Sequence, residues 1–396
     1  MTQNLRTRIH RARTLASFVP DWVSNRSDRV ENAELRLTWR CNARCIMCDI
    51  WRYSHDHDHQ LQEQTNLVPQ FRHELSTDEA RQVVDQLLPF GLQKLTISGG
   101  EPTLCRDLAD IVRHAADLGV RVHINSNGVA ITQERAVELV AAGLQQINLS
   151  VDGPTREVHD AVRGDGMFDR TVAAMRSLKA AAAGLGRPFH LHVHCVVMDT
   201  NYQVLDRFID TQEAWGWDSL SFGPLLHGEM DDWQQLNTAN RSAALTPQSI
   251  AHIVRVVAPR MVEKAAAHGL PAPSLPFGAT ETDFERNAGE TYCDPQQWCI
   301  VAWFNTTVQP TGDIIPCGYS PNSMALGNVL QQPFAQIYNG EPYQRFRASC
   351  KPAEYAMCRS CVLYMNYNAQ YAAVFRTLNS LVRPFNRQPR AIGATS

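Results

Sequence analysis

The sequence lacks several features that would assign it to a common class of protein. No run reaches the roughly 18 apolar residues of a membrane span. The basic stretch 1–24 contains no continuous apolar segment of the kind found in signal peptides. No block of five or more basic residues occurs and the net charge is -3, so the electrostatic signature of nucleic-acid binding is missing. We therefore expect a cytoplasmic protein with no membrane span and no nucleic-acid partner.

Cysteine, by contrast, is abundant, with 11 residues in a chain of 396. In a reducing cytoplasm, clustered thiols indicate metal binding or redox chemistry rather than disulfides. One group of cysteines lies within residues 41–48 and a second within residues 293–361. The sequence therefore predicts two separate metal sites.

Short β-branched runs alternate with helical patterns from residue 34 onward. The predicted strands are 34–39, 92–98, 120–126, 144–151, 189–197 and 217–223, and the predicted helices between them are 76–91, 106–119, 133–143, 168–184 and 201–216. Such repeats predict parallel strands with right-handed crossovers. Six repeats are too few for an eight-stranded barrel, so we predict an α/β fold: an open, partial (β/α)6 barrel with a C-terminal cysteine-rich auxiliary-cluster module. Its catalytic loops should follow the C-terminal ends of the strands.

Composition divides the rest of the chain. A further helix is expected at 247–269, followed by a Pro/Gly-rich link at 270–280. The predicted segments are an N-terminal tail (1–30), the barrel (31–230), a helical insertion and linker (231–290), the cysteine-rich module (291–370) and a C-terminal tail (371–396).

The first cysteine group has the spacing Cys41-x3-Cys45-x2-Cys48. Three thiolates on one short loop can hold three corners of a 4Fe–4S cube and leave the fourth iron open to a ligand. A zinc site would need a fourth ligand nearby, and the histidines of 55–59 (HDHDH) could supply it. A purely structural trio is the third reading.

The second predicted strand ends in Ser98-Gly99-Gly100-Glu101-Pro102, next to the cysteine loop in the expected fold. Two glycines allow a close backbone approach to a ligand. The Glu101 carboxylate can accept an ammonium group.

The order CNARCIMC followed by SGGEPTL resembles the radical S-adenosylmethionine (SAM) superfamily over roughly residues 34–223. The resemblance implies that Cys41, Cys45 and Cys48 hold the 4Fe–4S cluster. It also implies cofactor contacts from Met47 near the adenine, from Gly99, Gly100 and Glu101 at the methionine amine, from Ser126, Asn127, Ser150 and Asp152 along the cofactor, and from Arg163 at the methionine carboxylate. Turn formation before Gly128 and Gly153 is the alternative role for Asn127, Ser150 and Asp152. A surface salt bridge is the alternative for Arg163.

The second cysteine group combines Cys299-x12-Gly-x4-Cys317 with Cys358-x2-Cys361. Four thiolates make a closed site that suits either zinc or a 4Fe–4S cluster. The first half resembles the auxiliary-cluster modules called SPASM and Twitch, which implies a second, auxiliary 4Fe–4S cluster on these four residues. Cys293 or Cys350 could replace one of them. Cys105 and Cys195 are expected to be buried small hydrophobes.

The resemblance further implies reductive cleavage of SAM to a 5′-deoxyadenosyl radical, hydrogen abstraction from a C–H bond, and a flavodoxin- or ferredoxin-type reductant. Since only some 30 residues precede the first strand, we expect a small polar substrate, oxidised as by an aminosugar or cyclitol dehydrogenase, with an electron passing to the auxiliary cluster. Alternatives are a peptide- or protein-modifying maturase and a non-catalytic iron–sulfur scaffold or electron carrier.

No catalytic base can be assigned from the sequence. The candidates are His192 and His194, which share one face of a strand, Asp313, and the acidic loop 227–233.

Overall fold

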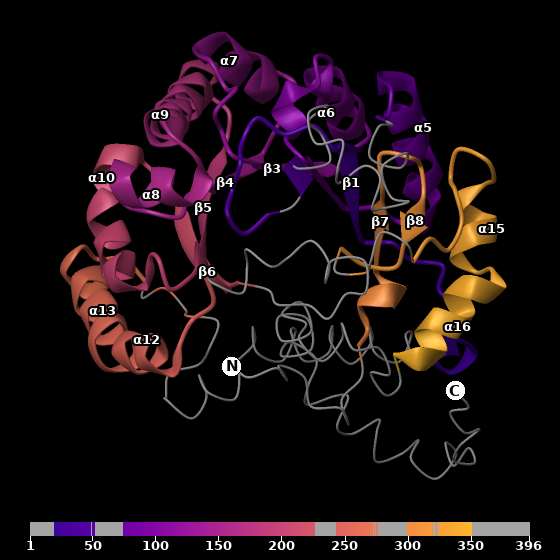
Figure 1. Cartoon of the computed structure of the whole chain (residues 1–396). Coiled ribbons are helices and arrows are strands. Elements are labelled where there is room, and N and C mark those ends of the chain that lie inside the picture. Colours follow the sequence, from indigo (N-terminus) through magenta and orange to yellow (C-terminus); the bar gives the residue numbers. More distant parts are fainter. Residues whose placement is uncertain are drawn as a thin grey trace, which may run out of the picture.

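The computed structural model describes residues 20–48, 50–51, 74–225, 243–271, 273, 275, 299–318, 320 and 324–350. Within these residues, helices and strands alternate along the chain from β1 to β6, as the sequence predicts. The strands form an arc with helices on its outer side (Figure 1).

One eight-stranded sheet organises the fold, in the order β6-β5-β4-β3-β2-β1-β7-β8. Its first six strands are β1 (Asn32–Thr38), β2 (Lys94–Gly99), β3 (Arg121–Ser126), β4 (Gln146–Ser150), β5 (His190–Val197) and β6 (Ser219–Pro224). Neighbours among these six are all parallel. Since β6 and β8 lie at opposite ends of the order, the sheet is open, which confirms the partial barrel.

Four crossover helices follow the predicted pattern: α5 (Thr77–Leu87), α6 (Leu108–Asp117), α7 (Gln133–Ala141) and α9 (Met167–Leu185). Ser76 caps α5 in a capping box with Glu79, as its sequence indicates. A 3-10 turn, η1 (Leu88–Phe90), completes this segment, and Gly91 ends it with a φ of 80°.

Two predicted helices are irregular. Residues 201–216 form mainly a 3-10 helix, η3 (Tyr202–Thr211), with only α10 (Gln212–Trp215) as α-helix. The segment 247–269 is divided into α12 (Pro247–His252), a π-helical stretch η4 (Ile253–Val257) and α13 (Ala258–Ala267). Pro259 cannot donate a backbone hydrogen bond to the preceding turn, which accounts for the change of register there.

Another helix, α8 (Arg156–Arg163), was not predicted. Its N-terminal turn follows Asp152 and Gly153, and its C-terminal end reaches the cysteine loop through backbone bonds. It therefore helps to form the site.

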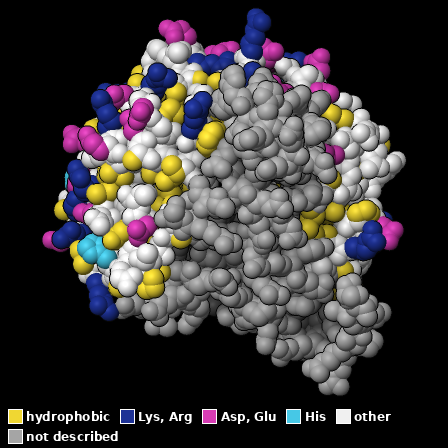
Figure 2. Space-filling model, viewed as in Figure 1, with side chains coloured by type: hydrophobic (Ala, Val, Ile, Leu, Met, Phe, Trp, Pro, Cys, Tyr) yellow, Lys and Arg dark blue, Asp and Glu magenta, His cyan; other side chains and the backbone are white. Residues whose placement is uncertain are grey.

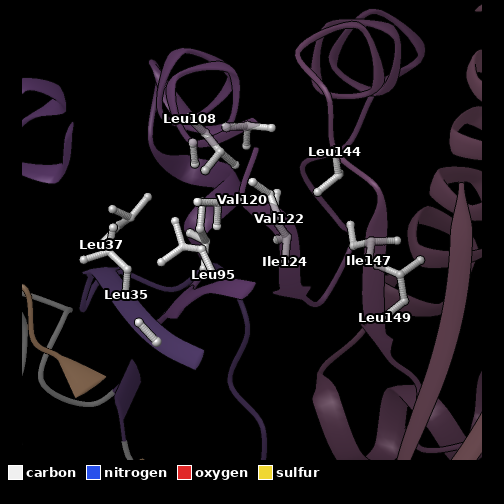
Figure 3. Packing of buried hydrophobic residues seen from close by; sticks show 14 of the residues in the cluster. Leu35, Leu37, Leu95, Leu108, Val120, Val122, Ile124, Leu144, Ile147 and Leu149 are labelled. Atoms are coloured by element: carbon white, nitrogen blue, oxygen red, sulfur yellow. The ribbon is translucent and has the colours of Figure 1, made fainter. Parts of the chain in front are cut away.

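The two faces of the sheet differ in chemistry. Residues on the outer face, such as Leu35, Leu95, Ile124 and Ile147, are fully buried against the helices (Figure 3). Each such side chain stabilises the fold by about 1.5–3 kcal/mol. The alternate positions of the six strands are polar: Glu34 and Arg36, Lys94 and Thr96, His123 and Asn125, Gln146 and Asn148, His190, His192 and His194, and Ser219 and Ser221. We call these positions the inner face.

The cysteine-rich segment adds strands to the same sheet. β7 (Asn305–Val308) pairs parallel with β1, and β8 (Ile314–Ile315) pairs antiparallel with β7. Although the sequence shows few helical signals here, the segment also contains η5 (Val301–Trp303), α15 (Phe334–Tyr338) and α16 (Glu341–Ser349). The buried Arg347 of α16 packs against the rings of Tyr338 and Tyr343, and it donates to the carbonyls of Tyr338 in α15 and Ala302 in η5.

Surface features agree with the composition. Lys and Arg side chains are interspersed with Asp and Glu over the described surface on the face that Figure 2 shows. Among the helices that the structure describes, none has the length and apolar character needed to span a bilayer.

Candidate active site

The loop with Cys41, Cys45 and Cys48 directly follows β1 at the C-terminal edge of the sheet. Its backbone is held by the end of α8, because the amide of Ile46 donates to the carbonyl of Val162 at 2.9 Å. The three cysteines lie in one small apolar cluster that also contains Met47 and Met167. The predicted trio is therefore gathered in one place.

Burial sets the protonation of these thiols. It raises the pKa of Cys41 to about 12 and raises the pKa of Cys45 as well, the latter opposed by the Arg163 guanidinium. The thiols of Cys41 and Cys45 are therefore neutral until a metal replaces their protons.

Gly99, which ends β2, and Gly100, which follows it, bring the ends of β1 and β2 together. The amide of Gly100 donates to the carbonyl of Thr38 at 2.6 Å, and that of Glu101 donates to the carbonyl of Arg40 at 2.7 Å. A Cβ atom at Gly100 would lie 2.5 Å from the carbonyl oxygen of Trp39. Gly100 therefore packs directly against the backbone that leads into Cys41.

The Glu101 carboxylate is buried and joins two loops. One oxygen accepts from the hydroxyls of Thr103 and Ser126, and the other accepts from the amide of Asn127 at 2.8 Å. Burial raises the pKa of Glu101, although these donors act in the opposite direction. The carboxylate thus orders the loops after β2 and β3.

Asn42, which the sequence did not single out, connects this network to the cysteine loop. The side-chain amide of Asn127 donates to its side-chain oxygen at 2.7 Å. The side chain of Asn127 also accepts from the amide of Val129, which is the turn contact considered as an alternative. Position 42, between two of the cysteines, is the only hint in the sequence.

Arg163 and Asp152 form a buried ion pair beside the cysteines. Arg163 Nε lies 2.6 Å from Asp152 Oδ2, although neither atom has an aligned hydrogen-bond partner. Arg163 Nη1 lies 3.7 Å from Cys45 Sγ. Asp152 is fully buried, and its backbone amide donates to the ring of His159, another residue that the sequence did not single out. Arg163 is therefore no surface residue.

Two family profiles match this chain. The profile of the Radical SAM superfamily matches residues 35–207, and that of SPASM, an iron–sulfur cluster-binding domain, matches residues 299–362. The mycofactocin maturase MftC of Mycobacterium ulcerans is 30% identical over 333 residues, which cover 83% of this chain and 79% of that protein. The AdoMet-dependent heme synthase of Methanosarcina barkeri is 27% identical over 345 residues, covering 82% and 89%.

This chain belongs to the radical SAM superfamily. Streptococcus suis SuiB with bound S-adenosylmethionine shares the fold, with a TM-score of 0.60 at 13% identity over 83% of this chain and 70% of that one. Native anSMEcpe with bound AdoMet gives a TM-score of 0.59 at 15% identity, covering 84% and 88%. A radical SAM protein with a SPASM region binds a 4Fe–4S cluster and SAM, and its SPASM region binds auxiliary iron–sulfur clusters.

The described residues fit these groups. Three neighbouring thiols are the donor set of an open 4Fe–4S cluster. Within the part of the chain that the structure describes, no group of three or more His, Cys, Asp or Glu side chains could hold a single metal ion. A cube does not need one, because three of its irons take one cysteine each and the fourth is left open. The Arg163 guanidinium carries its charge beside the cysteine loop, with Nη1 3.7 Å from Cys45 Sγ, and so suits a carboxylate bound there.

The remaining predicted cofactor residues lie at the same edge of the sheet. Met47 is packed in the cysteine cluster. Ser150 ends β4 and is paired in register with His194 of β5. Their contacts with SAM remain predictions.

The auxiliary site is described in part. The amide of Cys299 donates to the carbonyl of buried Cys350 at 3.2 Å, and a hydrogen bond with the Cys350 thiol lowers the pKa of Cys299. Cys317 Sγ contacts Ser320 Oγ at 3.1 Å. Cys293, Cys358 and Cys361 lie outside the described residues. Because Cys350 lies beside Cys299, it stays an alternative ligand.

The other cysteines and base candidates also have defined places. Cys195 is fully buried in the core, as expected, whereas Cys105 is only partly buried and packs against the core. Asp313 accepts from Thr311 and from Asn328, so its carboxylate stabilises a turn. Both ring nitrogens of His192 contact serine hydroxyls at 2.7 Å. The loop 227–233 and the histidines of 55–59 lie outside the described residues.

Proposed function

We propose that this radical SAM enzyme removes a hydrogen atom from a C–H bond of its substrate and completes a two-electron oxidation. The observation that supports this is the position of β1. Its C-terminal end leads into Cys41, its edge pairs with β7, and Arg36 Nη2 donates to the carbonyl of Gly318, next to Cys317, at 2.7 Å. The segments expected to hold the two clusters are thus both attached to β1, one along the chain and the other through strand pairing and the Arg36 contact.

Bound together, the first cluster and SAM would supply a 5′-deoxyadenosyl radical, and the auxiliary cluster would accept the electron left on the substrate. The residues of the chain would position these groups. Cys41, Cys45 and Cys48 would hold the first cluster, and Arg163 would bind the SAM carboxylate from its place beside Cys45. Glu101 and Asn127 would order the loops around them. A flavodoxin- or ferredoxin-type protein would provide the reducing electron.

A peptide is the substrate class that the relatives favour. The PqqA peptide cyclase of Streptomyces rochei is 27% identical over 334 residues, covering 83% of this chain and 80% of that protein. SuiB, of similar fold, has been solved with its precursor peptide SuiA. We propose a polar peptide that lies along the inner face, where most side chains are hydrogen-bonding groups.

A small polar molecule, such as an aminosugar or cyclitol, is the second candidate. The polar inner face favours it equally, because hydroxyl and amine groups need hydrogen-bond partners when they leave water. Oxidation would then convert a carbinol carbon into a ketone.

The first test is anaerobic reconstitution with iron and sulfide, followed by incubation with SAM and a reductant. Wild type should release 5′-deoxyadenosine, whereas the Cys41→Ala, Cys45→Ala, Cys48→Ala triple variant should lose about four irons and all cleavage. The triple variant should keep iron and sulfide at its auxiliary site. Release of 5′-deoxyadenosine by that variant would refute the cluster assignment, and zinc without labile sulfide would make the second site structural.

The substrate classes are separated by mass and label. A precursor peptide encoded beside this gene should lose two hydrogens when incubated with the enzyme. A cyclitol deuterated at its carbinol carbon should instead pass deuterium into 5′-deoxyadenosine. Full oxidation of either substrate after Cys299→Ala and Cys317→Ala had emptied the auxiliary site would contradict the proposed electron path.

A further inference from the structure

A row of alternating histidines and serines crosses two strands of the inner face. His190 Nε2 contacts Ser219 Oγ at 2.6 Å, and the same hydroxyl contacts His192 Nδ1 at 2.7 Å. His192 Nε2 contacts Ser221 Oγ at 2.7 Å, and that hydroxyl contacts His194 Nδ1 at 2.8 Å. Five side chains from β5 and β6 therefore form one unbroken series of hydrogen bonds, which we call the His–Ser row.

The row follows from the sequence of the two strands. Histidines at every second position of β5 point to one face, and serines at every second position of β6 point to the same face. Parallel pairing sets Ser219 opposite His192 and Ser221 opposite His194. Each hydroxyl thereby lies between two successive imidazole rings.

Each link can carry its hydrogen in either direction. A neutral imidazole has one N–H and one acceptor nitrogen, and a serine hydroxyl both donates and accepts. All four bonds can be satisfied with the hydrogens directed toward His194, or all four with them directed toward His190. Burial lowers the pKa of His192 to about 4 and also lowers the pKa of His194, so these two rings are neutral near pH 7. Passing one proton along the row converts one arrangement into the other.

The two ends of the row lie in different surroundings. His194 is near the C-terminal end of β5, where the charges of Asp152 and Arg163 both act on its pKa, and so it adjoins the candidate active site. His190 is the first residue of β5, at the opposite end of the strand.

The pattern is interrupted at the active-site end. The next inner-face position of β6 after Ser221 is Gly223, which has no hydroxyl to continue the row. A Cβ atom there would lie 2.9 Å from His194 Nε2. Among the described residues His194 Nε2 has no hydrogen-bond partner, so this nitrogen is the open end of the row.

We infer that the His–Ser row conducts the substrate's proton from His194 at the active site to His190 at the opposite end of the sheet. This rests on the proposed function. In that reaction the substrate loses a hydrogen atom to the radical and an electron to the auxiliary cluster. It must also lose a proton. His194 Nε2 takes this proton while His194 Nδ1 gives one to Ser221, which gives one to His192 Nε2. In turn, His192 Nδ1 gives a proton to Ser219, which gives one to His190 Nε2. His190 Nδ1 then releases a proton. One proton enters, one leaves, and every group stays neutral.

The test measures whether a substitution near one end of the row changes the tautomer of the histidine at the other end. Two-bond hydrogen–nitrogen correlation spectra of the reconstituted enzyme, labelled with nitrogen-15 in its histidines, report the tautomer of each ring. In wild type, both nitrogens of His194 should have shifts between those of N–H and bare nitrogen, since both arrangements are populated. Ser219→Ala, which touches His190 and His192 but not His194, should move the His194 shifts toward a single tautomer.

Two variants serve as controls. Ser219→Thr keeps the hydroxyl and should leave His194 as in wild type. Asn148→Ala removes an inner-face amide that is paired in register with His192 but lies outside the row, and should also leave His194 unchanged. If Ser219→Ala does not fold, His190→Gln replaces it as the distant change.

The inference is wrong if His194 keeps its wild-type shifts in Ser219→Ala while His190 and His192 change, because the row would then be a static set of hydrogen bonds. The measurement needs no substrate. A negative result would therefore leave the proposed oxidation standing, and failure to find an oxidised product would leave the row intact.

Discussion

Arg163 is a buried residue rather than a surface one, and its guanidinium is paired with the fully buried Asp152. Removing one member of a buried pair leaves the other charge uncompensated. We expect Arg163→Gln to lower the free energy of unfolding by about 3–5 kcal/mol, as measured by urea denaturation. Arg156→Gln in the same helix breaks an exposed pair with Asp169 and should cost at most about 1 kcal/mol. Equal losses in the two variants would show that the buried pair has no special role in stability.

Gly100 offers a second test at this scale. A methyl group there meets backbone carbonyls rather than a flexible side chain, so the ends of β1 and β2 must separate. We expect Gly100→Ala to cost about 1–3 kcal/mol and to lower the iron bound by the cysteine loop after reconstitution. Gly184→Ala, where nothing lies within 4 Å, should keep both stability and iron content. A full complement of iron in Gly100→Ala would contradict the argument.

The candidate site could be predicted from sequence as far as local patterns reach. The spacing of Cys41, Cys45 and Cys48 follows from what one loop can offer an iron–sulfur cube, and the structure gathers them together. Asn42 could not be predicted as a partner, because its contact with Asn127 joins two loops that are distant in sequence. The contact of His159 with the amide of Asp152 spans only seven residues, but it depends on α8, which the sequence did not indicate. An asparagine in a loop has the same local preferences whether or not another asparagine is near.

At the scale of elements, β1 connects the two cluster-binding segments. Arg36 pairs with Glu34 at 3.3 Å and donates to Gly318. Burial raises the pKa of Glu34, but the Arg36 charge and the Ser98 hydroxyl outweigh it and lower that pKa overall. We expect Arg36→Gln to destabilise the chain by about 1–3 kcal/mol and to weaken iron retention at the auxiliary site, measured in the triple cysteine variant.

The matched change is Arg113→Gln, which removes an exposed pair with Asp110 on α6. It should leave auxiliary iron at the level of the parent variant. Loss of iron in both variants would point to general destabilisation rather than to the contact between β1 and the auxiliary site.

Elements with strong local signals were predictable, and α8 was not. The capping box of α5 and the glycine after η1 mark their ends in the sequence itself. The eight residues of α8 are too few for a stable isolated helix. Its stability comes from the contacts of His159, Val162 and Arg163, which exist only after folding.

For the whole molecule, buried neutral histidines predict acid sensitivity. Burial lowers the pKa of both His159 and His192 to about 4, whereas histidine in an unfolded chain titrates near about 6.5. The unfolded chain therefore binds more protons between these values. Stability from these groups is complete above pH 6.5 and is lost as the pH falls toward 4, by at most about 1.4 kcal/mol per pH unit for each ring.

Urea denaturation at pH 7, 6 and 5 measures this slope. His159→Gln should reduce the slope of stability against pH by the contribution of one ring. Glu101, whose pKa is raised by burial, acts in the opposite direction as the pH rises through its folded value. A slope unchanged in His159→Gln would mean that this ring takes up its proton equally in the folded and unfolded chains.

The overall architecture was predictable only up to β6. Alternation of strand and helix patterns is enough to derive a parallel open sheet. No local pattern indicates that β7, which starts at Asn305, pairs with β1, which starts at Asn32. That pairing depends on the edge of a sheet that is complete only in three dimensions.

This pairing of distant segments also has a consequence for synthesis on the ribosome. About 80 residues separate the end of β6 at Pro224 from the start of β7 at Asn305. At about 5–20 residues per second, the ribosome needs about 4–16 s to produce them. During that interval the nascent chain can already hold six paired strands while the backbone groups along the edge of β1 have no neighbour. Slower translation of this stretch would lengthen the time for which the edge of β1 can pair with wrong partners, next to the three thiols of the loop that follows β1.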